Sequence, residues 1–208
     1  MRNCASQKLN LNKSMRTIFA ITLILATLPS LSWSETINID DLVIRDSLYF
    51  KKFTDVPFTG EAKITEETNP FRAIRGDGHF VNGKKDGFWR KYHSINGPLR
   101  SRSNYSNGIR TGLYEQYYKN GQLWQKGNYK AEKKDGFWKY YSKSGVLDFE
   151  GVYQKGVENG LWKFYHKNGQ LSARIEKKNG WYDGLAEYFN EDGSLSKTET
   201  YEDGKLLE

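Results

Sequence analysis

Cysteine is nearly absent from this chain, with one in 208 residues, and histidine is scarce, with three. The cysteine, Cys4, precedes an apolar run near the N-terminus. If the N-terminal segment that contains Cys4 is cleaved off, the remaining chain has no disulfide, no thiol nucleophile and no cysteine metal ligand. The sequence also contains no HExxH, no CxxC and no glycine loop of the kind that cradles phosphate. We therefore expect a protein that is not an enzyme, with no catalytic residue, no metal site and no cofactor.

Long apolar runs are also missing, apart from Ile18–Ala26. This run is too short for a transmembrane helix, which needs about 20 apolar residues. It follows a basic residue and precedes small residues at a cleavage position, as in a secretory signal peptide. We expect residues 1–34 to be a signal peptide, with either Met1 or Met15 as the true start. The mature protein would then be exported to the periplasm or cell surface of a bacterium.

The basic charge of the chain is concentrated in this leader. The formal charge of +7 falls to +3 in the remaining 174 residues, because the leader takes four cations and no acid. A small surplus that is spread over the whole chain does not form the basic stripe typical of nucleic-acid-binding proteins. We therefore expect no nucleic acid partner.

Helical periodicity is absent from the rest of the chain, so helices should be scarce. The sequence instead repeats every 24 residues. Glycines, leucines and tyrosines recur at this interval, and Lys177 interrupts the tyrosine series. A fixed period of this size predicts stacked supersecondary units that contact mainly their neighbours, as is typical of binding proteins. The three series are Gly97, Gly121, Gly145, Gly169 and Gly193; Leu99, Leu123, Leu147, Leu171 and Leu195; and Tyr105, Tyr129, Tyr153 and Tyr201.

Each repeat is interpreted as two antiparallel strands and two turns. Aromatic residues favour strands, and alternation puts Phe137 on one face and Trp138 and Tyr140 on the other. Asn-Gly and Asp-Gly pairs mark tight hairpin turns. The fold class is therefore all-β: an elongated, twisted antiparallel β-meander of about five hairpin repeats. We expect about 10–13 strands and a sheet roughly 50–60 Å long. The final strand, Ser196–Glu202, is predicted to be a charged edge.

The N-terminal part of the mature chain is less regular. Residues 35–80 are predicted to form an N-terminal cap or a degenerate repeat, and residues 81–208 to form the hairpin repeats. Within the cap, Leu42–Arg45 and Leu48–Lys51 are expected to flank a hairpin turn, and Phe58–Ile64 to form a further strand.

Two kinds of polar residue are candidates for catalysis. His93 and His166 occupy equivalent repeat positions, where Tyr118 stands in another copy. A metal or acid–base pair is one interpretation, but a tolerated polar position explains these histidines better. The acid pair Glu191-Asp192 lies in a predicted loop, and a solvated turn explains it better than a glycosidase pair.

Aromatic residues that depart from the repeat are the candidate partner-binding residues. Trp124 stands where other copies carry arginine, aspartate or serine. Trp181 and Tyr182 occupy a predicted turn, where other copies carry mostly charged residues. Large aromatics outside a common pattern are candidates for contact with a partner. Alternatively, Trp181 covers the gap that Lys177 leaves among the tyrosines and is structural. Tryptophans within the regular pattern are expected in the core.

The repeats resemble the MORN-repeat-variant family. The stretches that carry the resemblance are Gly136–Tyr141, Gly145–Leu147, Tyr153–Gly156 and Gly160–Leu171, and Tyr49–Gly60 is similar to the segment that precedes the repeats in such chains. The resemblance covers roughly residues 42–206. Many bacterial members are described as antitoxins of the YwqK type. MORN proteins are linked to scaffolding, membrane junctions and self-association, so the resemblance implies contact with a protein, with a membrane surface or with a second copy.

These observations predict an exported, non-catalytic repeat protein that acts as a protein-interaction or envelope scaffold module. Its expected partner is a protein or an envelope component. A sharper version makes it an antitoxin or immunity protein that masks a toxin. The alternative is a cell-wall module that binds carbohydrate or choline-type ligands, because aromatic side chains form cages for cations. Such modules have shorter repeats with a different aromatic order.

Overall fold

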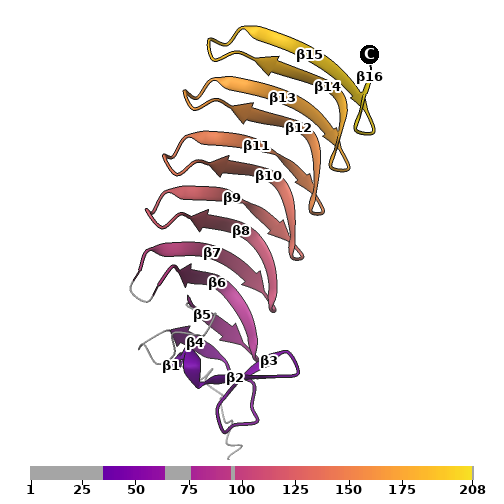
Figure 1. Cartoon of the computed structure of the whole chain (residues 1–208). Helices are drawn as coiled ribbons and strands as arrows, with labels where there is room; N and C mark the ends of the chain where they lie inside the picture. The colour runs from indigo at the N-terminus through magenta and orange to yellow at the C-terminus, as the bar shows by residue number, and fades with distance from the viewer. Residues whose placement is uncertain (1–34, 64–75, 95–96, 208) are drawn as a thin grey trace, which may run out of the picture. The chain divides into compact units, whose positions relative to one another are not determined.

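The computed structural model describes residues 35–63, 76–94 and 97–207. The predicted signal peptide lies outside these residues. The main feature is one sheet of 14 strands, in which each strand from β4 onward pairs with the strand that follows it in the sheet (Figure 1). The strands, in spatial order, are β1 (Thr36–Asn38), β4 (Gly60–Lys63), β5 (Gly76–Val81), β6 (Lys84–Tyr92), β7 (Leu99–Ser106), β8 (Ile109–Tyr117), β9 (Leu123–Lys130), β10 (Lys133–Tyr141), β11 (Leu147–Gln154), β12 (Val157–Tyr165), β13 (Leu171–Lys178), β14 (Trp181–Phe189), β15 (Leu195–Glu202) and β16 (Lys205–Leu207).

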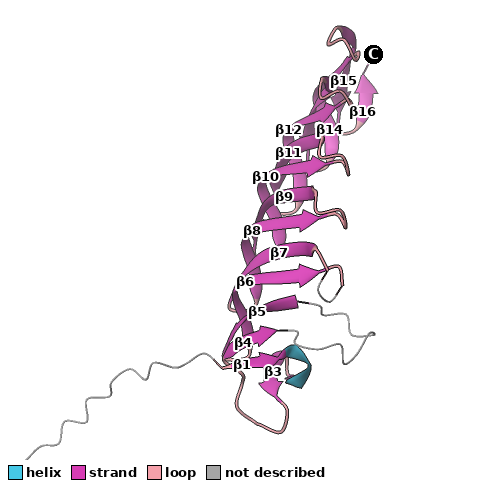
Figure 2. Cartoon of the chain, turned by 90° about the vertical axis from the view of Figure 1, so that its left-hand side faces the viewer, coloured by secondary structure: helices cyan, strands magenta, loops and turns pink. Residues whose placement is uncertain are grey.

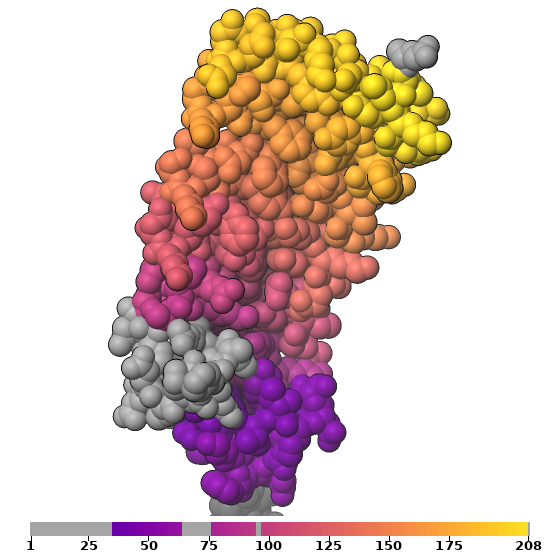
Figure 3. Space-filling model, viewed as in Figure 1, coloured from indigo at the N-terminus to yellow at the C-terminus, as the bar shows by residue number. Residues whose placement is uncertain are grey.

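The predicted all-β meander is confirmed, with two corrections. The described residues contain 16 strands, more than the 10–13 expected, because the N-terminal segment contributes five and the chain adds β16. The charged strand β15 is not the last one, since β16 pairs with it at Thr200–Glu202. Strand β1 pairs with β4 in parallel, and the other pairs in the sheet are antiparallel. The sheet therefore grows hairpin by hairpin, and the colours in Figure 3 follow one another along it in chain order.

The N-terminal segment forms the predicted hairpin against one end of the sheet. Strands β2 (Leu42–Arg45) and β3 (Leu48–Lys51) pair across a two-residue turn, after a short 3-10 turn at Ile39–Asp41 (Figure 2). The Tyr49 amide donates to the Gly83 carbonyl at 2.8 Å. The rings of Tyr49 and Phe80 lie 4.6 Å apart. This hairpin therefore closes the first apolar cluster of the sheet, which contains Ile37, Ile39, Leu42, Phe58, Ala62, Phe80, Trp89 and Tyr105.

The longer strands bend, and the sheet is curved as a result (Figure 1). Strand β10, for example, pairs with β9 at Lys133–Asp135 and again at Lys139–Tyr140, with a register shift between the two segments. Gly136 lies in this interval with φ of 79°, a conformation that glycine adopts without a Cβ penalty. The equivalent strands β6, β8, β12 and β14 carry glycines with positive φ at the same place. The bend therefore recurs in each repeat.

The core lines the face that we call the inner face, defined by Trp89, Trp138 and Trp162. These side chains are at most 2% exposed although the repeats form a single sheet. Tyrosines from the neighbouring strands pack edge-on against them, with ring centroids 5.3 Å apart for Tyr129 and Trp138 and 5.2 Å apart for Tyr153 and Trp162. The tryptophans of the regular pattern are thus core residues, as predicted, and aromatic contacts join each repeat to the next.

Two kinds of turn alternate along the two edges of the sheet. One edge has two-residue turns in which both residues have positive φ, as at Asn107 (51°) and Gly108 (84°). These turns also bond to the preceding hairpin: the Gly108 amide donates to the Lys85 carbonyl at 2.8 Å. The other edge has longer turns such as the one around Asn120-Gly121, where the Asn120 amide group donates to the Lys143 carbonyl at 2.9 Å. Both edges therefore hold neighbouring repeats together.

Candidate functional site

The face opposite the buried tryptophans, the outer face, carries a column of exposed apolar side chains. Each member directly follows the glycine at the bend of a long strand, so the column repeats on every second strand, at intervals of roughly 10 Å. The intervening strands place Asn104, Asn128, Val152, Glu176 and Thr200 opposite the five members, so apolar and mostly polar side chains alternate along this line. We call this set the apolar column; its members are Phe88, Leu113, Phe137, Leu161 and Leu185.

A row of charged residues runs beside the apolar column on the same face. Each member lies directly opposite the next one on the neighbouring strand, across ten successive strands. The order of charges is one acid followed by two cations, repeated along the sheet and ending on an acid. We call this row the charged belt; it contains Asp77, Arg90, Arg102, Glu115, Lys126, Lys139, Glu150, Lys163, Arg174 and Glu187.

The acids of the belt are shielded and its cations face solvent. The four acidic side chains are 11–15% exposed, whereas the four cations paired with them are 35–55% exposed. Nε of Arg90 donates to Asp77 at 2.9 Å, and Nζ of Lys139 lies 3.0 Å from Glu150. The solvent therefore meets mainly positive charge, although the belt contains both signs.

Glu115 and Glu150 of the belt stay ionised because of their hydrogen bonds. Burial raises the pKa of the Glu115 carboxyl, but hydrogen bonds from Arg102 and Tyr117 outweigh it, so that the pKa lies below its usual value. Burial acts in the same direction on the pKa of Glu150, and hydrogen bonds from Lys139 and Tyr165 again lower it below the ordinary value. These acids therefore hold the neighbouring cations in place at neutral pH.

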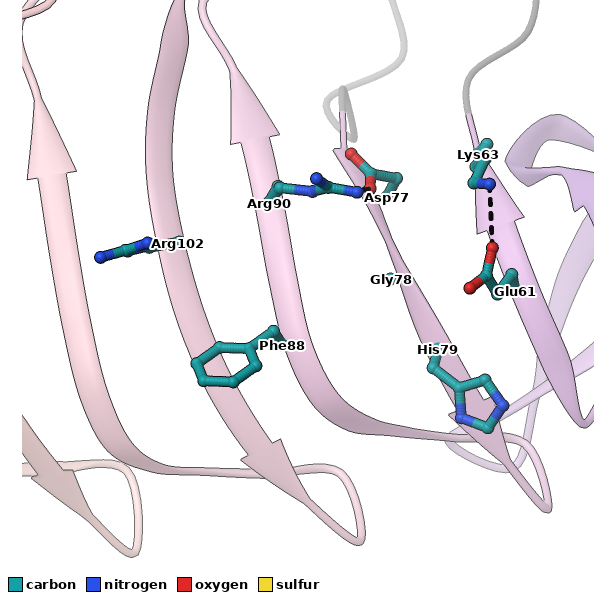
Figure 4. A pocket seen from close by; sticks show the side chains of 8 residues that line it. All are labelled: Glu61, Lys63, Asp77, Gly78, His79, Phe88, Arg90 and Arg102. Carbon is teal, nitrogen blue, oxygen red and sulfur yellow. Dashed lines mark hydrogen bonds and ion pairs between the residues drawn. The ribbon is translucent and has the colours of Figure 1, made fainter.

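A hollow of about 380 Å³ lies where the belt and the column begin (Figure 4). Strands β4 to β7 line it with Glu61, Lys63, Asp77, Gly78, His79, Phe88, Arg90 and Arg102. Glu61 is paired with Lys63 at 2.9 Å, and Asp77 with Arg90. Phe88, the first member of the column, is 66% exposed beside these charges. The hollow thus combines an aromatic wall with charged groups of both signs.

The inner face also carries charge, but there it is packed among aromatic rings. Nζ of Lys134 lies 4.3 Å from the Trp138 ring and donates to the Tyr140 hydroxyl at 2.7 Å. One repeat further on, Glu158 stands at the position of Lys134, and Lys177 stands at the position of Tyr153. Nζ of Lys177 lies 2.5 Å from the Glu158 carboxylate. These groups fill the space between aromatic rings and belong to the core.

The structure separates the candidate residues rather than bringing them together. Trp124 lies on the outer face of β9, near the edge with the longer turns, and its ring is 5.8 Å from Tyr118. Trp181 and Tyr182 are not in a turn, as the sequence suggested, but are the first two residues of β14, at the opposite edge. The turn itself is formed by Asn179 and Gly180.

Trp181 and Tyr182 also point to opposite faces, because neighbouring residues alternate along a strand. Trp181 is 66% exposed and lies against the turn at Gly204. Tyr182 packs with the buried residues around Ile175, edge-on to Tyr201. Tyr182 also lies next to Lys177, with 5.3 Å between ammonium and ring. The gap in the tyrosine series is thus occupied by Lys177 and Tyr182 and is not covered by Trp181.

The two histidines of the repeats join neighbouring repeats. Nε2 of His93 lies 2.9 Å from the Tyr117 carbonyl, and Nε2 of His166 lies 2.8 Å from the Phe189 carbonyl. Tyr118, at the equivalent position, donates its hydroxyl to another repeat's carbonyl in the same way. Within the described residues, no cluster of three or more histidine, cysteine, aspartate or glutamate side chains could hold a metal ion. No helix in that part of the chain is long and apolar enough to span a membrane.

The repeats match a known family model at three places. The model described as MORN repeat variant matches residues 110–131, 158–179 and 182–203. Each stretch begins at a long strand, passes through a longer turn and ends after the next strand, so one match corresponds to one hairpin. The second and third of these hairpins follow each other directly in the chain. The chain thus contains MORN-variant repeats, which are consistent with a repeat-containing protein-binding module.

Comparison with whole proteins adds little. No curated relative matches the sequence. Among solved structures, the chain is similar to one titled the crystal structure of the GtfA/B complex bound to UDP and GlcNAc. The identity is 14% and the TM-score 0.22, over 64% of this chain and 24% of that chain. The chain therefore spans about a quarter of the length of that protein.

Sequence reasoning did not identify the apolar column or the charged belt. The signal for the column was present, since each member follows a repeat glycine by one residue. The belt has no such signal, because its charges repeat over three strands whereas the sequence repeats over two. Only the pairing of the strands shows that these ten residues lie in one row.

Proposed function

We propose that this protein is an exported, non-catalytic interaction module that binds a protein partner through the outer face of its sheet. The observation that carries the proposal is the apolar column, five exposed Phe and Leu side chains in one line. Interfaces are built around apolar anchors that are desolvated on binding, with polar groups at the rim. The apolar column and the charged belt beside it have this composition.

The alternative of a carbohydrate or choline-type module is less well supported by the surface. Such a module needs exposed aromatic rings that can stack on a sugar or enclose a cation. Trp89, Trp138 and Trp162 are buried in the core, and the exposed rings of the sheet lie on four different strands, Phe88 on β6, Trp124 on β9, Phe137 on β10 and Trp181 on β14. The aromatic repeat of the sequence is thus used for packing between strands.

Export and an antitoxin role are the finer parts of the proposal. Export rests on the sequence of residues 1–34. A protein that masks a toxin needs a large contact surface, and the outer face runs along the whole series of repeats. A toxin reading frame next to the gene and a complex of the two products would support the antitoxin role. A mature chain that retains residues 1–34 in intact-mass analysis would argue against export.

Site-specific photo-crosslinking tests the proposed face. A benzoylphenylalanine at position 137 or 161 is expected to capture a protein partner in cells that produce this chain naturally. The same probe at position 143, an exposed turn residue away from the column, is the matched control. Crosslinks of equal yield at 137 and 143, or none at 137 and 161, would contradict binding through the outer face.

A further inference from the structure

The charged belt contains three places where two cations face each other directly on neighbouring strands. The pairs are Arg90 with Arg102, Lys126 with Lys139, and Lys163 with Arg174. Like charges directly opposite each other in an antiparallel pair are destabilising. The three pairs recur every third strand, roughly 14 Å apart. Four of the six cations are ion-paired with the belt acid on their other side, as Arg90 is with Asp77. Lys126 and Lys163 have no ion pair among the described residues, so a partner can add a contact at these two positions.

From these three pairs we infer that the outer face recognises an acidic polypeptide, whose carboxylates lie between the two cations of each pair. This inference rests on the proposed function, because it assigns the charge of the partner that binds the same face. Lys126 and Lys163 are available for such contacts. The four ion-paired cations are more exposed than the acids that they bind, and their remaining N–H groups face solvent. Exposed guanidinium groups bind carboxylates through two parallel hydrogen bonds.

The first cation pair lies in the hollow, which gives the partner an anchoring point. Arg90 and Arg102 line the hollow together with Phe88 (Figure 4). Arg90 turns to Asp77 and Arg102 turns the other way, to Glu115. A carboxylate of the partner therefore binds the N–H groups that these ion pairs leave over, and a neighbouring apolar side chain contacts the exposed phenyl ring. The other two pairs lie further along the sheet, beside later members of the apolar column.

The spacing of the belt favours a polypeptide over other polyanions. Duplex DNA carries one charge about every 1.7 Å along its axis, and an anionic membrane is negative over its whole surface. Such a continuous polyanion would also meet Glu115 and Glu150, which stay ionised between the cation pairs. A polypeptide with spaced carboxylates and apolar residues between them fits both the belt and the column.

Binding of a labelled random copolymer of glutamate and tyrosine, measured by fluorescence anisotropy, tests the inference on the full mature chain. The test variant is Lys126→Gln with Lys163→Gln. These lysines belong to two cation pairs, and their removal leaves the ion pairs of Lys139 with Glu150 and of Arg174 with Glu187 intact. The control is Lys143→Gln with Lys167→Gln, which removes the same charge from exposed turns.

The copolymer is expected to bind at low salt and to dissociate at about 0.5 M NaCl, where charges are screened beyond a few ångströms. The test variant should bind about tenfold more weakly, as expected for two lost charge contacts, and the control should change less than about twofold. Thermal denaturation should show both variants folded. Equal weakening by the two variants, no copolymer binding, or tighter belt-dependent binding of duplex DNA or of phosphatidylglycerol vesicles would overturn the inference.

The crosslinking probes and the belt variant together distinguish failure of this inference from failure of the proposed function. A partner captured at position 137 that binds the test variant as well as the natural chain leaves the proposed function standing and overturns the acidic partner. Copolymer binding that depends on the belt, with no crosslinked protein at 137 or 161, contradicts the proposed function instead.

Discussion

The Trp162 indole lies directly over Gly151 on the neighbouring strand, and a Cβ on that glycine would be 2.2 Å from the indole ring. Trp138 has the same relationship to Gly127, and Trp89 to Gly78, at 2.3 and 2.4 Å. A single-layer sheet has little depth in which to bury an indole. A glycine on the adjacent strand, which has no side chain, provides that depth. The tryptophan and the glycine of neighbouring strands therefore form one packing unit, repeated along the sheet.

Gly151→Ala is expected to destabilise the protein by about 2–3 kcal/mol, because the added methyl group overpacks the core against a rigid ring. Urea denaturation gives the free energy of unfolding. Gly136→Ala is the comparison: no atom lies within 4 Å of its Cβ position, so its cost comes only from its positive φ. Combining Gly151→Ala with Trp162→Leu should cost less than the sum of the two changes. Additive costs would show that the indole and the glycine do not share one space.

Trp162→Ala and Trp181→Ala should differ strongly in their effect on stability. Trp162 is 1% exposed, and truncating a buried tryptophan costs about 3–5 kcal/mol. Trp181 lies mostly in solvent, and such changes usually cost well under 1 kcal/mol. Chemical denaturation of the two variants measures both values. If Trp181→Ala costs as much as Trp162→Ala, its contact with the turn at Gly204 is structural and Trp181 is not available to a partner.

Much of the fold could be predicted because the repeat is a local feature. The glycines and the alternation of Phe137, Trp138 and Tyr140 indicate turns and faces within a few residues of chain. The hairpin of Leu42–Arg45 with Leu48–Lys51 was likewise visible, since its two strands are separated by two residues. The extra strand β16 was missed because its three residues carry no alternating pattern and pair only through the position of β15.

The surface was harder to predict, because departures from a repeat do not show where a residue points. Trp181 and Tyr182 are adjacent in sequence, yet one is in solvent and the other in the core. The charged belt depends on the register of ten strands, which no single stretch of sequence contains. The surroundings of a residue such as Lys126 are set by Lys139 and Glu115, which face it on the two neighbouring strands.

The ion pair of Glu158 with Lys177 is expected to replace the contact of Lys134 with the Tyr153 ring in the preceding repeat. Glu158 stands at the position of Lys134, and Lys177 at the position of Tyr153. Glu158→Lys alone places two ammonium groups together in a mostly buried site, and should cost roughly 3 kcal/mol. Adding Lys177→Tyr recreates the arrangement of the preceding repeat and should recover most of this loss. Urea denaturation of the two single variants and the double variant completes the cycle. A double variant no more stable than Glu158→Lys would contradict the equivalence of the two sites.

Stability should rise between pH 8 and about pH 10. Burial lowers the pKa of the Lys85 ammonium from 10.5 to about 8, so between these values the unfolded chain binds the proton and the folded chain does not. Stability rises with pH wherever the unfolded state binds more protons. Above pH 10 the trend reverses, because burial raises the pKa of Tyr114 to about 12, and the folded chain then binds the extra proton.

Urea denaturation over this pH range measures the dependence, and Lys85→Met should flatten its rising limb and raise stability at neutral pH. Lys119→Met, at an exposed turn position, is the control and should leave the curve unchanged. A rising limb that persists in Lys85→Met would assign it to another group, such as Lys134, whose pKa burial also lowers.

Deleting residues 181–208 should weaken the protein and promote its association. The deletion removes β14, whose Ala186 covers Ile175 on β13, and leaves one edge of β13 without a partner strand, while β12 stays paired with the other edge. An unpaired edge above an uncovered apolar cluster is a template for pairing with another chain. We expect the melting temperature to fall by roughly 10 °C or more, and light scattering to show association. Deletion of residues 204–208 alone is the control, since it removes only β16, whose side chains are exposed, and it should change the melting temperature little. An unchanged melting temperature in the longer deletion would show that contacts between neighbouring repeats do not stabilise this sheet.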